Sequence, residues 1–285
     1  MDYLKMFLAT TASLTTASAL LLYKYQQKLI YPNHLVADGA GVPHDTPDLY
    51  DLEYEDLIIE TIDHIKIHGF LCLQPKSRLN LQNETVLILN PNAGNIGLAL
   101  PTVKNFHNSG YNVLIYDYRG YGTSTGEPSE IGLKIDADTI LKFIENHEIL
   151  KDSEVTLYGR SLGGAVAIYL ASKNHPLINK VILENTFLSI RKTIPHVFPF
   201  LKHVSWLCHQ LWDSETLITK VQSNVKFLFL SAELDEIVPP SHMKKLYELV
   251  EEYDYKKFIL FEGAHHNDTP LYPGYWDIVS DFLDL

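Results

Sequence analysis

Short apolar runs separated by helix-length stretches are the feature of this sequence that most constrains its fold. Four such runs follow one another, at Val86–Leu89, Val113–Tyr116, Val155–Tyr158 and Val181–Leu183. A continuously apolar strand is typical of a sheet that is buried on both faces, as parallel sheets are. The stretches between the runs, clearest at Gly132–Asn146 and Leu162–Lys173, therefore predict an α/β fold: a mostly parallel sheet with right-handed crossovers and helices on both faces.

Further elements extend this pattern on both sides. Residues Leu57–Glu60 and His64–Leu73 alternate between apolar and polar side chains, which predicts an antiparallel pair of strands. Near the carboxyl end, the sequence predicts two more strands and two more helices. These are strands at Val225–Leu230 and Phe258–Phe261, and helices at Ser241–Tyr253 and Pro273–Leu283.

Residues 187–220 interrupt the alternation, and we interpret them as a helical lid inserted over the carboxyl edge of the sheet. Two prolines, Pro195 and Pro199, break the stretch, and it is rich in aromatic residues: Phe187, Phe198, Phe200, Trp206 and Trp212. Two interpretations of these side chains stay open. They pack the insertion onto the body of the domain, or they also line an apolar pocket for a substrate chain.

The overall composition excludes several classes of protein. Of 285 residues, 46% are hydrophobic, which suits a folded core, and the formal net charge is −12. A chain this acidic, without clustered cationic side chains, is not expected to bind nucleic acid. The two cysteines, Cys72 and Cys208, are too far apart in sequence for a C-x-x-C motif, so we expect neither a disulfide framework nor a zinc knuckle.

The N-terminal segment differs from the rest of the chain. Residues Met6–Tyr23 are 18 consecutive uncharged residues, which as a helix span roughly 27 Å, close to the thickness of a bilayer core. The small residues Ala17–Ala19 precede the most apolar run, which argues against a cleaved signal peptide. The segment also contains no arginine, the first being Arg78, which argues against a transit peptide. We therefore predict a single-pass membrane anchor in residues 1–33, a linker at 34–49 and one α/β domain at 50–285. The organelle, endomembrane or mitochondrial, and the orientation stay open.

The candidate nucleophile lies in the pentapeptide Gly159–Gly163, a G-x-S-x-G motif centred on Ser161. It directly follows the buried run Val155–Tyr158 and opens the helix that begins near Leu162. This strand, turn and helix is the setting of a nucleophile elbow, in which flanking glycines leave room for a strained serine whose hydroxyl points outward. The motif therefore predicts a catalytic Ser161.

A serine nucleophile needs a base and an acid, which in α/β-hydrolases follow it in the order acid and then histidine. Asp235 follows the run Val225–Leu230 and is the predicted acid, ahead of Glu233 and Asp268. His265 and His266 both follow the run Phe258–Phe261, and the spacing alone does not choose between them.

Two backbone N–H groups are predicted to stabilise the oxyanion of an acyl-transfer intermediate. One belongs to Leu162, the residue after the serine. The other is expected in the loop Asn90–Gly97, where Pro91 has no N–H and Asn92 is the more suitable donor. This loop lacks the G-K-[ST] ending of a phosphate-binding loop.

No metal or organic cofactor is expected from the sequence. The chain has 13 histidines but no H-E-x-x-H or similar spacing. His64 and His68 fall on the same face of a predicted alternating strand, and we expect them to face solvent rather than to bind a metal.

Four separated motifs together resemble the α/β-hydrolase superfamily, and within it the membrane-anchored branch that contains α/β-hydrolase domain-containing protein thirteen and its fungal relatives. They occur in the family's order, at residues 92–97, 116–122, 159–164 and 266–268. The histidine of the family's His-Asn-Asp triplet is catalytic, so the resemblance implies His266 rather than His265 as the base. The family usually has His-Gly where this chain has Asn90-Pro91.

The resemblance also bears on the substrate, because neighbouring members of the branch are palmitoyl-protein thioesterases. It implies long acyl thioesters as candidate substrates, including acylated proteins. The resulting hypothesis is a membrane-anchored serine hydrolase of esters or thioesters. Alternatives are a lipid or small-ester hydrolase and a non-catalytic α/β-hydrolase scaffold that binds lipid or protein.

Overall fold

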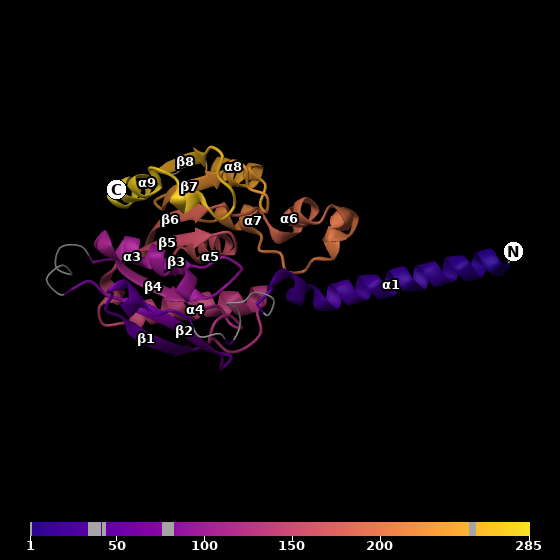
Figure 1. The fold of residues 1–285 in the computed structure, drawn as a ribbon, viewed down its shortest axis with the longest axis horizontal. Helices are drawn as coiled ribbons and strands as arrows, with labels where there is room; N and C mark the ends of the chain where they lie inside the picture. Colours follow the sequence, from indigo (N-terminus) through magenta and orange to yellow (C-terminus); the bar gives the residue numbers. More distant parts are fainter. Residues whose placement is uncertain (1, 34–40, 42–43, 76–82, 251–254) are drawn as a thin grey trace.

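The computed structural model describes residues 2–33, 41, 44–75, 83–250 and 255–285, and its centre is an eight-stranded sheet (Figure 1). The strand order is β1-β2-β4-β3-β5-β6-β7-β8. Strand β2 pairs antiparallel with β1 and β4, and every other pairing is parallel. The strands are β1 Glu55–Glu60, β2 Lys66–Cys72, β3 Glu84–Leu89, β4 Asn112–Tyr116, β5 Glu154–Arg160, β6 Ile178–Glu184, β7 Lys226–Ala232 and β8 Lys256–Phe261.

Helices cover both faces of the sheet and divide the core into two layers. The helices are α3 Leu100–Asn108, α4 Glu130–Asn146, α5 Leu162–Ala171, α8 Pro240–Leu249 and α9 Tyr275–Leu283. Apolar side chains of α4, α5 and α8 form one layer, and those of α3 and α9 form the other. Alternate residues of β3 serve the two layers, since Leu87 and Leu89 lie in the first and Val86 and Ile88 in the second. Because successive residues of a strand point to opposite faces and both faces are buried here, the central strands are apolar at every position.

The predicted α/β-hydrolase fold is therefore confirmed, and the differences concern boundaries and one helix. Each predicted strand is present, with ends shifted by a few residues. Helix α5 ends at Ala171 rather than Lys173, and α8 ends at Leu249, while residues 251–253 of the predicted helix lie outside the described residues. Helix α3, which was not among the helices assigned from sequence, follows the 3-10 turn η2 (Ile96–Ala99).

The expectation for the two histidines of the first hairpin was wrong for His68. His64 lies in the turn before β2, with φ 63°, and is exposed beside Glu60. His68 lies within β2 and is buried, because His44 and Phe70 pack against its ring. Residues that precede β1 thus cover a face of β2 that its alternating sequence marked as exposed.

The interruption expected at 187–220 lies between β6 and β7 and is helical. It contains α6 Ile190–Val197, the 3-10 segment η4 Pro199–Leu207 and the short helix α7 Ser214–Ile218. The side chain of Ser189 caps α6 by accepting a hydrogen bond from Lys192 N–H. We refer to residues 187–220 as the insertion.

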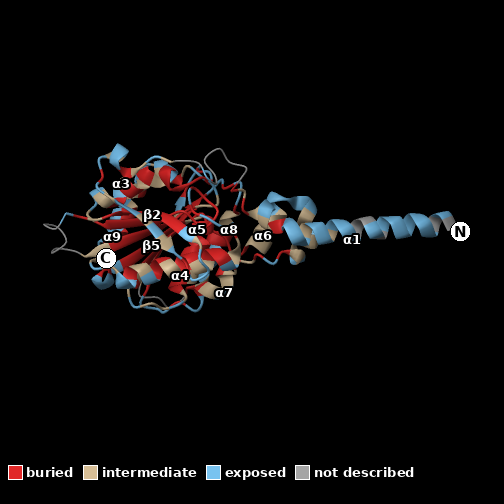
Figure 2. Ribbon diagram, turned by 90° about the horizontal axis from the view of Figure 1, so that it is seen from below, coloured by how far each residue is buried: buried red, intermediate tan, exposed pale blue. Residues whose placement is uncertain are grey.

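Helix α1 (Asp2–Ile30) extends away from the domain and is largely exposed (Figures 1 and 2). Its segment Lys5–Ile30 is long and apolar enough to cross a membrane by length and composition. The hydroxyls of Thr10 and Thr11 donate to the carbonyls of Met6 and Phe7, both at 2.9 Å. Such bonds within the helix reduce the cost of placing threonine in an apolar medium.

The carboxyl end of α1 is attached to the insertion. Gln26 donates to the carbonyl of Leu207 at 3.2 Å, and its side-chain oxygen accepts from His209 N–H at 2.8 Å. Just beyond the helix, Tyr31 is buried, and its hydroxyl accepts from the indole N–H of Trp212 at 2.9 Å. Of the predicted linker at 34–49, residues 34–40, 42 and 43 lie outside the described residues.

Candidate active site

Ser161 occupies a sharp turn between β5 and α5. Its backbone has φ 54° and ψ −116°, a strained region for a residue other than glycine. The turn is also crowded: a Cβ at Gly159 would lie 2.3 Å from the carbonyl oxygen of Gly163, and one at Gly163 would lie 1.9 Å from that of Leu89. Only glycine at these two positions lets β5, the turn and the end of β3 approach so closely.

His266 and Asp235 form a buried pair at the same edge of the sheet. The Nδ1 atom of His266 lies 2.7 Å from Oδ2 of Asp235. The other carboxylate oxygen of Asp235 accepts from the N–H groups of Ile237, at 2.9 Å, and Val238, at 2.7 Å. These bonds fix the carboxylate in its loop, so that it can orient the imidazole ring.

The competing candidates from the sequence have other partners. His265 is exposed, and its Nδ1 lies 3.2 Å from Oε2 of Glu236. Glu233 accepts from Gly263 N–H at 2.9 Å, and Asp268 accepts from His265 N–H at 2.7 Å. The structure thus brings His266, and not His265, against Asp235.

Asn185 is a site residue that the sequence analysis missed. It follows β6 with φ 47°, and its buried side chain donates to the carbonyl of His266, at 3.0 Å, and to the hydroxyl of Thr269, at 2.8 Å. Its amide oxygen accepts from Ala232 N–H at the end of β7, at 2.7 Å. Asn185 therefore ties the histidine loop to the strand that carries the acid. The signal was present, since Asn185 directly follows a buried strand, and a polar residue in the loop after a buried strand also identified Asp235.

The two predicted oxyanion donors both border one cavity with Ser161. Leu162 is the first residue of α5, so its N–H has no partner within the helix. Asn92 lies in the loop after β3, where its side chain is fixed by two hydrogen bonds: it donates to the carbonyl of Ile30 and accepts from the hydroxyl of Tyr121 at 2.7 Å. The loop is thereby connected to the last residue of α1.

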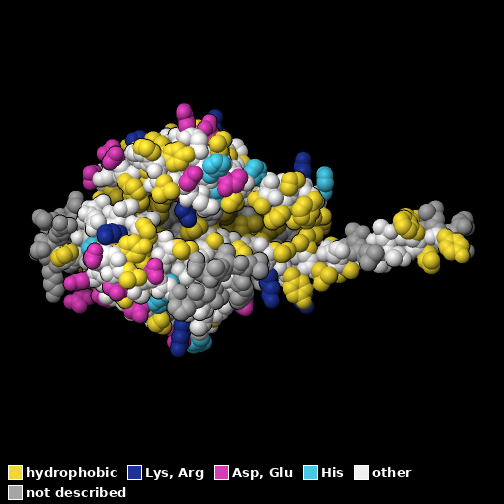
Figure 3. Space-filling view, viewed as in Figure 1, with side chains coloured by type: hydrophobic (Ala, Val, Ile, Leu, Met, Phe, Trp, Pro, Cys, Tyr) yellow, Lys and Arg dark blue, Asp and Glu magenta, His cyan; other side chains and the backbone are white. Residues whose placement is uncertain are grey.

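The cavity beside Ser161 is mostly apolar and has a volume of about 780 Å³. Ser161 and His266 lie in its wall together with residues of three other elements. These come from α1 (Leu22, Gln26, Leu29, Ile30), from α6 (Ile190, Thr193, Ile194, Val197) and from η4 (Phe200, Leu201, Val204, Ser205, Leu207). Figure 3 shows hydrophobic side chains gathered on the insertion near the base of α1, where the surface is hollowed. The site is therefore reached through a space with apolar walls.

The aromatic residues of the insertion divide between the two interpretations. Phe187, Phe198 and Phe200 line the cavity. Trp206 is 67% exposed and does not line the cavity. Trp212 is 1% exposed, and its indole N–H donates a hydrogen bond to the hydroxyl of Tyr31. Neither tryptophan lines the cavity: Trp212 fits the first interpretation, in which the side chain packs the insertion onto the domain, and Trp206 faces outward.

Comparison with known proteins places this geometry in context. The profile of the family described as "Serine aminopeptidase, S33" matches residues 82–224. A Saccharomyces cerevisiae protein described as an uncharacterized membrane protein, YNL320W, is 49% identical over 98% of this chain and 96% of its own length. Protein bem46 of Schizosaccharomyces pombe is 43% identical over 92% of this chain and 87% of its own length.

More distant relatives and solved structures agree in fold. The α/β-hydrolase domain-containing protein WAV2 of Arabidopsis thaliana is 33% identical over 95% of this chain and 91% of its own length. The structure of the esterase Pf2001 of Pyrococcus furiosus superposes with a TM-score of 0.71 at 20% identity, covering 87% of this chain and 96% of that one. At that identity the likeness concerns the fold alone.

The buried His242 on α8 predicts a pH dependence of stability. Burial, and then the positive charges of Lys192 and His196, lower the pKa of His242 to about 4. In the unfolded chain the histidine ring takes up a proton near pH 6.5, whereas in the folded protein it stays neutral until about pH 4. The free energy of unfolding therefore keeps its full value above pH 6.5 and decreases as the pH falls towards 4. Between pH 7 and 4, we expect the free energy of unfolding to fall by roughly 3 kcal/mol less in His242→Gln than in the wild type.

Chemical denaturation of the detergent-solubilised protein at a series of pH values checks this expectation. His64→Gln is the matched control, because His64 is exposed. The control should follow the pH profile of the wild type. An unchanged profile for His242→Gln would contradict the assignment of a neutral buried ring.

Proposed function

The chain belongs to the α/β-hydrolase family, and we propose that it is a membrane-anchored serine hydrolase that cleaves long-chain acyl esters or thioesters. The observation that carries the proposal is the shared wall of the cavity. Ser161 and His266 border the same apolar space as α1 and the insertion. Moving a chain of methylene groups from water into such a space is favourable by about 0.8 kcal/mol for each buried CH₂.

In the proposed mechanism, Ser161 Oγ attacks the acyl carbonyl carbon and His266 accepts its proton. Asp235 keeps the ring in position through Nδ1 and stabilises the imidazolium. The negative charge on the carbonyl oxygen is held by the N–H groups of Leu162 and Asn92. His266 then protonates the leaving alcohol or thiol, and a water molecule, activated by the same ring, releases the acid from Ser161.

The proposed membrane anchor is supported by α1 and by one relative. The helix contains a segment of sufficient length and hydropathy, Lys5–Ile30, and the Saccharomyces cerevisiae relative is described as a membrane protein. Because the last turns of α1 also line the cavity, a membrane-inserted α1 would hold the cavity opening near the membrane surface. Such a position suits an acylated protein or a lipid, whose chains reside in the bilayer. The proposed location is an endomembrane or a mitochondrial membrane.

Labelling by a fluorophosphonate probe tests the nucleophile. We expect the full-length protein in detergent to be labelled and Ser161→Ala to lose at least 99% of the label, since the probe reacts only with an activated serine. Ser205→Ala is the matched control, because Ser205 lines the same cavity from η4 and should leave labelling unchanged.

The measurement is in-gel fluorescence, with a known serine hydrolase in the same tube. A wild type that stays unlabelled beside a labelled reference would contradict the mechanism and favour a non-catalytic scaffold. Persistent labelling of Ser161→Ala would place the nucleophile elsewhere.

Chain-length selectivity tests the role of the cavity. Ile194→Trp places a larger side chain into the cavity from α6. We therefore expect the kcat/KM for C16 acyl substrates, divided by that for C4 substrates, to fall roughly tenfold or more. A tenfold fall corresponds to about 1.4 kcal/mol in the activation free energy. Trp206→Phe is the control, since Trp206 is exposed outside the cavity.

Matched oxygen esters and thioesters of each length are assayed in parallel, which separates a thioesterase from an esterase. If Ile194→Trp lowers kcat/KM equally for C16 and C4 substrates, the acyl chain does not occupy this space.

A further inference from the structure

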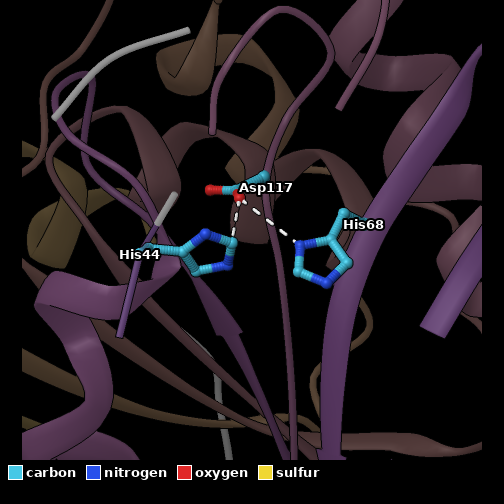
Figure 4. A group of neighbouring side chains, drawn as sticks. All are labelled: His44, His68 and Asp117. Carbon is cyan, nitrogen blue, oxygen red and sulfur yellow. Dashed lines mark ion pairs between the residues drawn. The ribbon is translucent and has the colours of Figure 1, made fainter. Parts of the chain in front are cut away.

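Three side chains far apart in sequence converge beside β4, outside the proposed active site (Figure 4). His44 precedes the 3-10 turn η1 (Pro47–Tyr50), His68 lies in β2, and Asp117 directly follows β4. Their side chains are almost entirely buried, with exposed fractions of 5%, 8% and 1% respectively. Histidine and aspartate so deep in a protein need partners for their polar atoms.

The polar atoms at the centre of this cluster have no such partners. Nε2 of His44 lies 3.9 Å from Oδ2 of Asp117, and Nδ1 of His68 lies 4.0 Å from the same oxygen. Both distances are too long for hydrogen bonds. Within the described residues, these three buried atoms make no hydrogen bond. As Figure 4 shows, the carboxylate and the two rings instead point towards a common centre.

The surrounding contacts indicate that a cation belongs at that centre. Oδ1 of Asp117 accepts from Ile96 N–H at 2.9 Å, which leaves Oδ2 as an uncompensated buried acceptor. On the far side of His68, Nε2 lies 2.6 Å from the carboxylate of Asp56. That bond places a proton on Nε2, so in the neutral ring the lone pair of Nδ1 faces Oδ2 of Asp117. Two lone pairs opposed in a buried site repel each other unless a positive charge lies between them.

We propose that His44, His68 and Asp117 bind a zinc ion through Nε2, Nδ1 and Oδ2, with a water molecule as fourth ligand. Two ligands of a tetrahedral zinc ion lie about 3.4 Å apart, given zinc bonds of about 2.0 to 2.2 Å. The cluster thus needs to contract by about half an ångström on its two measured sides. Two imidazoles favour zinc over magnesium or calcium, which prefer oxygen ligands. Asp56 holds the ring of His68 through Nε2, as carboxylates commonly do for the histidine ligands of zinc.

The ion would join segments that flank the proposed active site. His44 belongs to the segment between α1 and the sheet, and Asp117 holds Ile96 in the loop that begins at Asn90. That loop also carries Asn92, the proposed oxyanion donor. Zinc would therefore fix the end of the linker and the oxyanion loop to β2 and β4. The ligand set is separate from the triad, so the zinc proposal stands or fails independently of the proposed hydrolase activity.

Metal content and zinc titration of the full-length protein in detergent test the site. After treatment with a chelator and its removal, we expect the wild type to bind one Zn²⁺ per chain, measured by calorimetry and by elemental analysis. His68→Ala and Asp117→Asn should weaken binding at least a hundredfold, and Asp56→Asn by 10- to 100-fold. His64→Ala is the matched control from the same hairpin and should bind as the wild type does.

Cobalt substitution separates loss of the site from loss of the fold. Co²⁺ in a tetrahedral site gives strong visible absorption bands, which we expect in the wild type and in His64→Ala but not in Asp117→Asn. Asp117→Asn keeps an oxygen that can accept from Ile96 N–H, and its circular dichroism spectrum reports folding. Absence of stoichiometric zinc in the wild type would overturn the proposal. Undiminished binding by both ligand variants would also overturn it, since the ion would then lie elsewhere, for example at the exposed His265 and Glu236 pair.

Discussion

The strained turn at Ser161 is the constraint on which the rest of the site depends. Its positive φ places the serine at the carboxyl edge of the sheet only because Gly163 lies directly against the carbonyl of Leu89. That contact joins the end of β5 to the end of β3 and to the loop that carries Asn92. Strain of this kind costs about 1 to 3 kcal/mol and persists only where the surrounding packing holds it. Two buried apolar layers, one on each face of the sheet, supply that packing.

Much of the fold and of the chemistry could be predicted from sequence because both depend on local patterns. Continuously apolar runs predicted the central strands, and Ser161, Asp235 and His266 lie in turns or loops that follow predicted strands. The orientation of side chains across the sheet could not be predicted in the same way. His68 alternates as an exposed strand residue would, yet His44, which is 24 positions earlier, covers it. The sequence left open whether Trp212 packs the insertion or lines a pocket, and a hydrogen bond to Tyr31, 181 positions away, holds it in the core.

Helix α1 is the element whose role changes most between sequence and structure. Its apolar composition predicted a membrane anchor separate from the domain. In the structure its last turns form part of the cavity wall, where Leu22, Leu29 and Ile30 lie opposite the insertion. Gln26 and the pair of Tyr31 and Trp212 hold it there. The same helix thus extends from the domain and shapes the space beside Ser161, which is the physical basis for proposing a substrate with a long acyl chain.

Photo-cross-linking measures the position of that chain most directly. A long-chain fluorophosphonate with a diazirine at the end of its alkyl chain is attached to the full-length protein and activated by light, and the cross-linked peptides are identified by mass spectrometry. The account predicts attachment at Ser161 and cross-links to residues 22–30 of α1 or to α6 and η4. Cross-links confined to α3 or α9, which lie in the layer on the other face of the sheet, would contradict it.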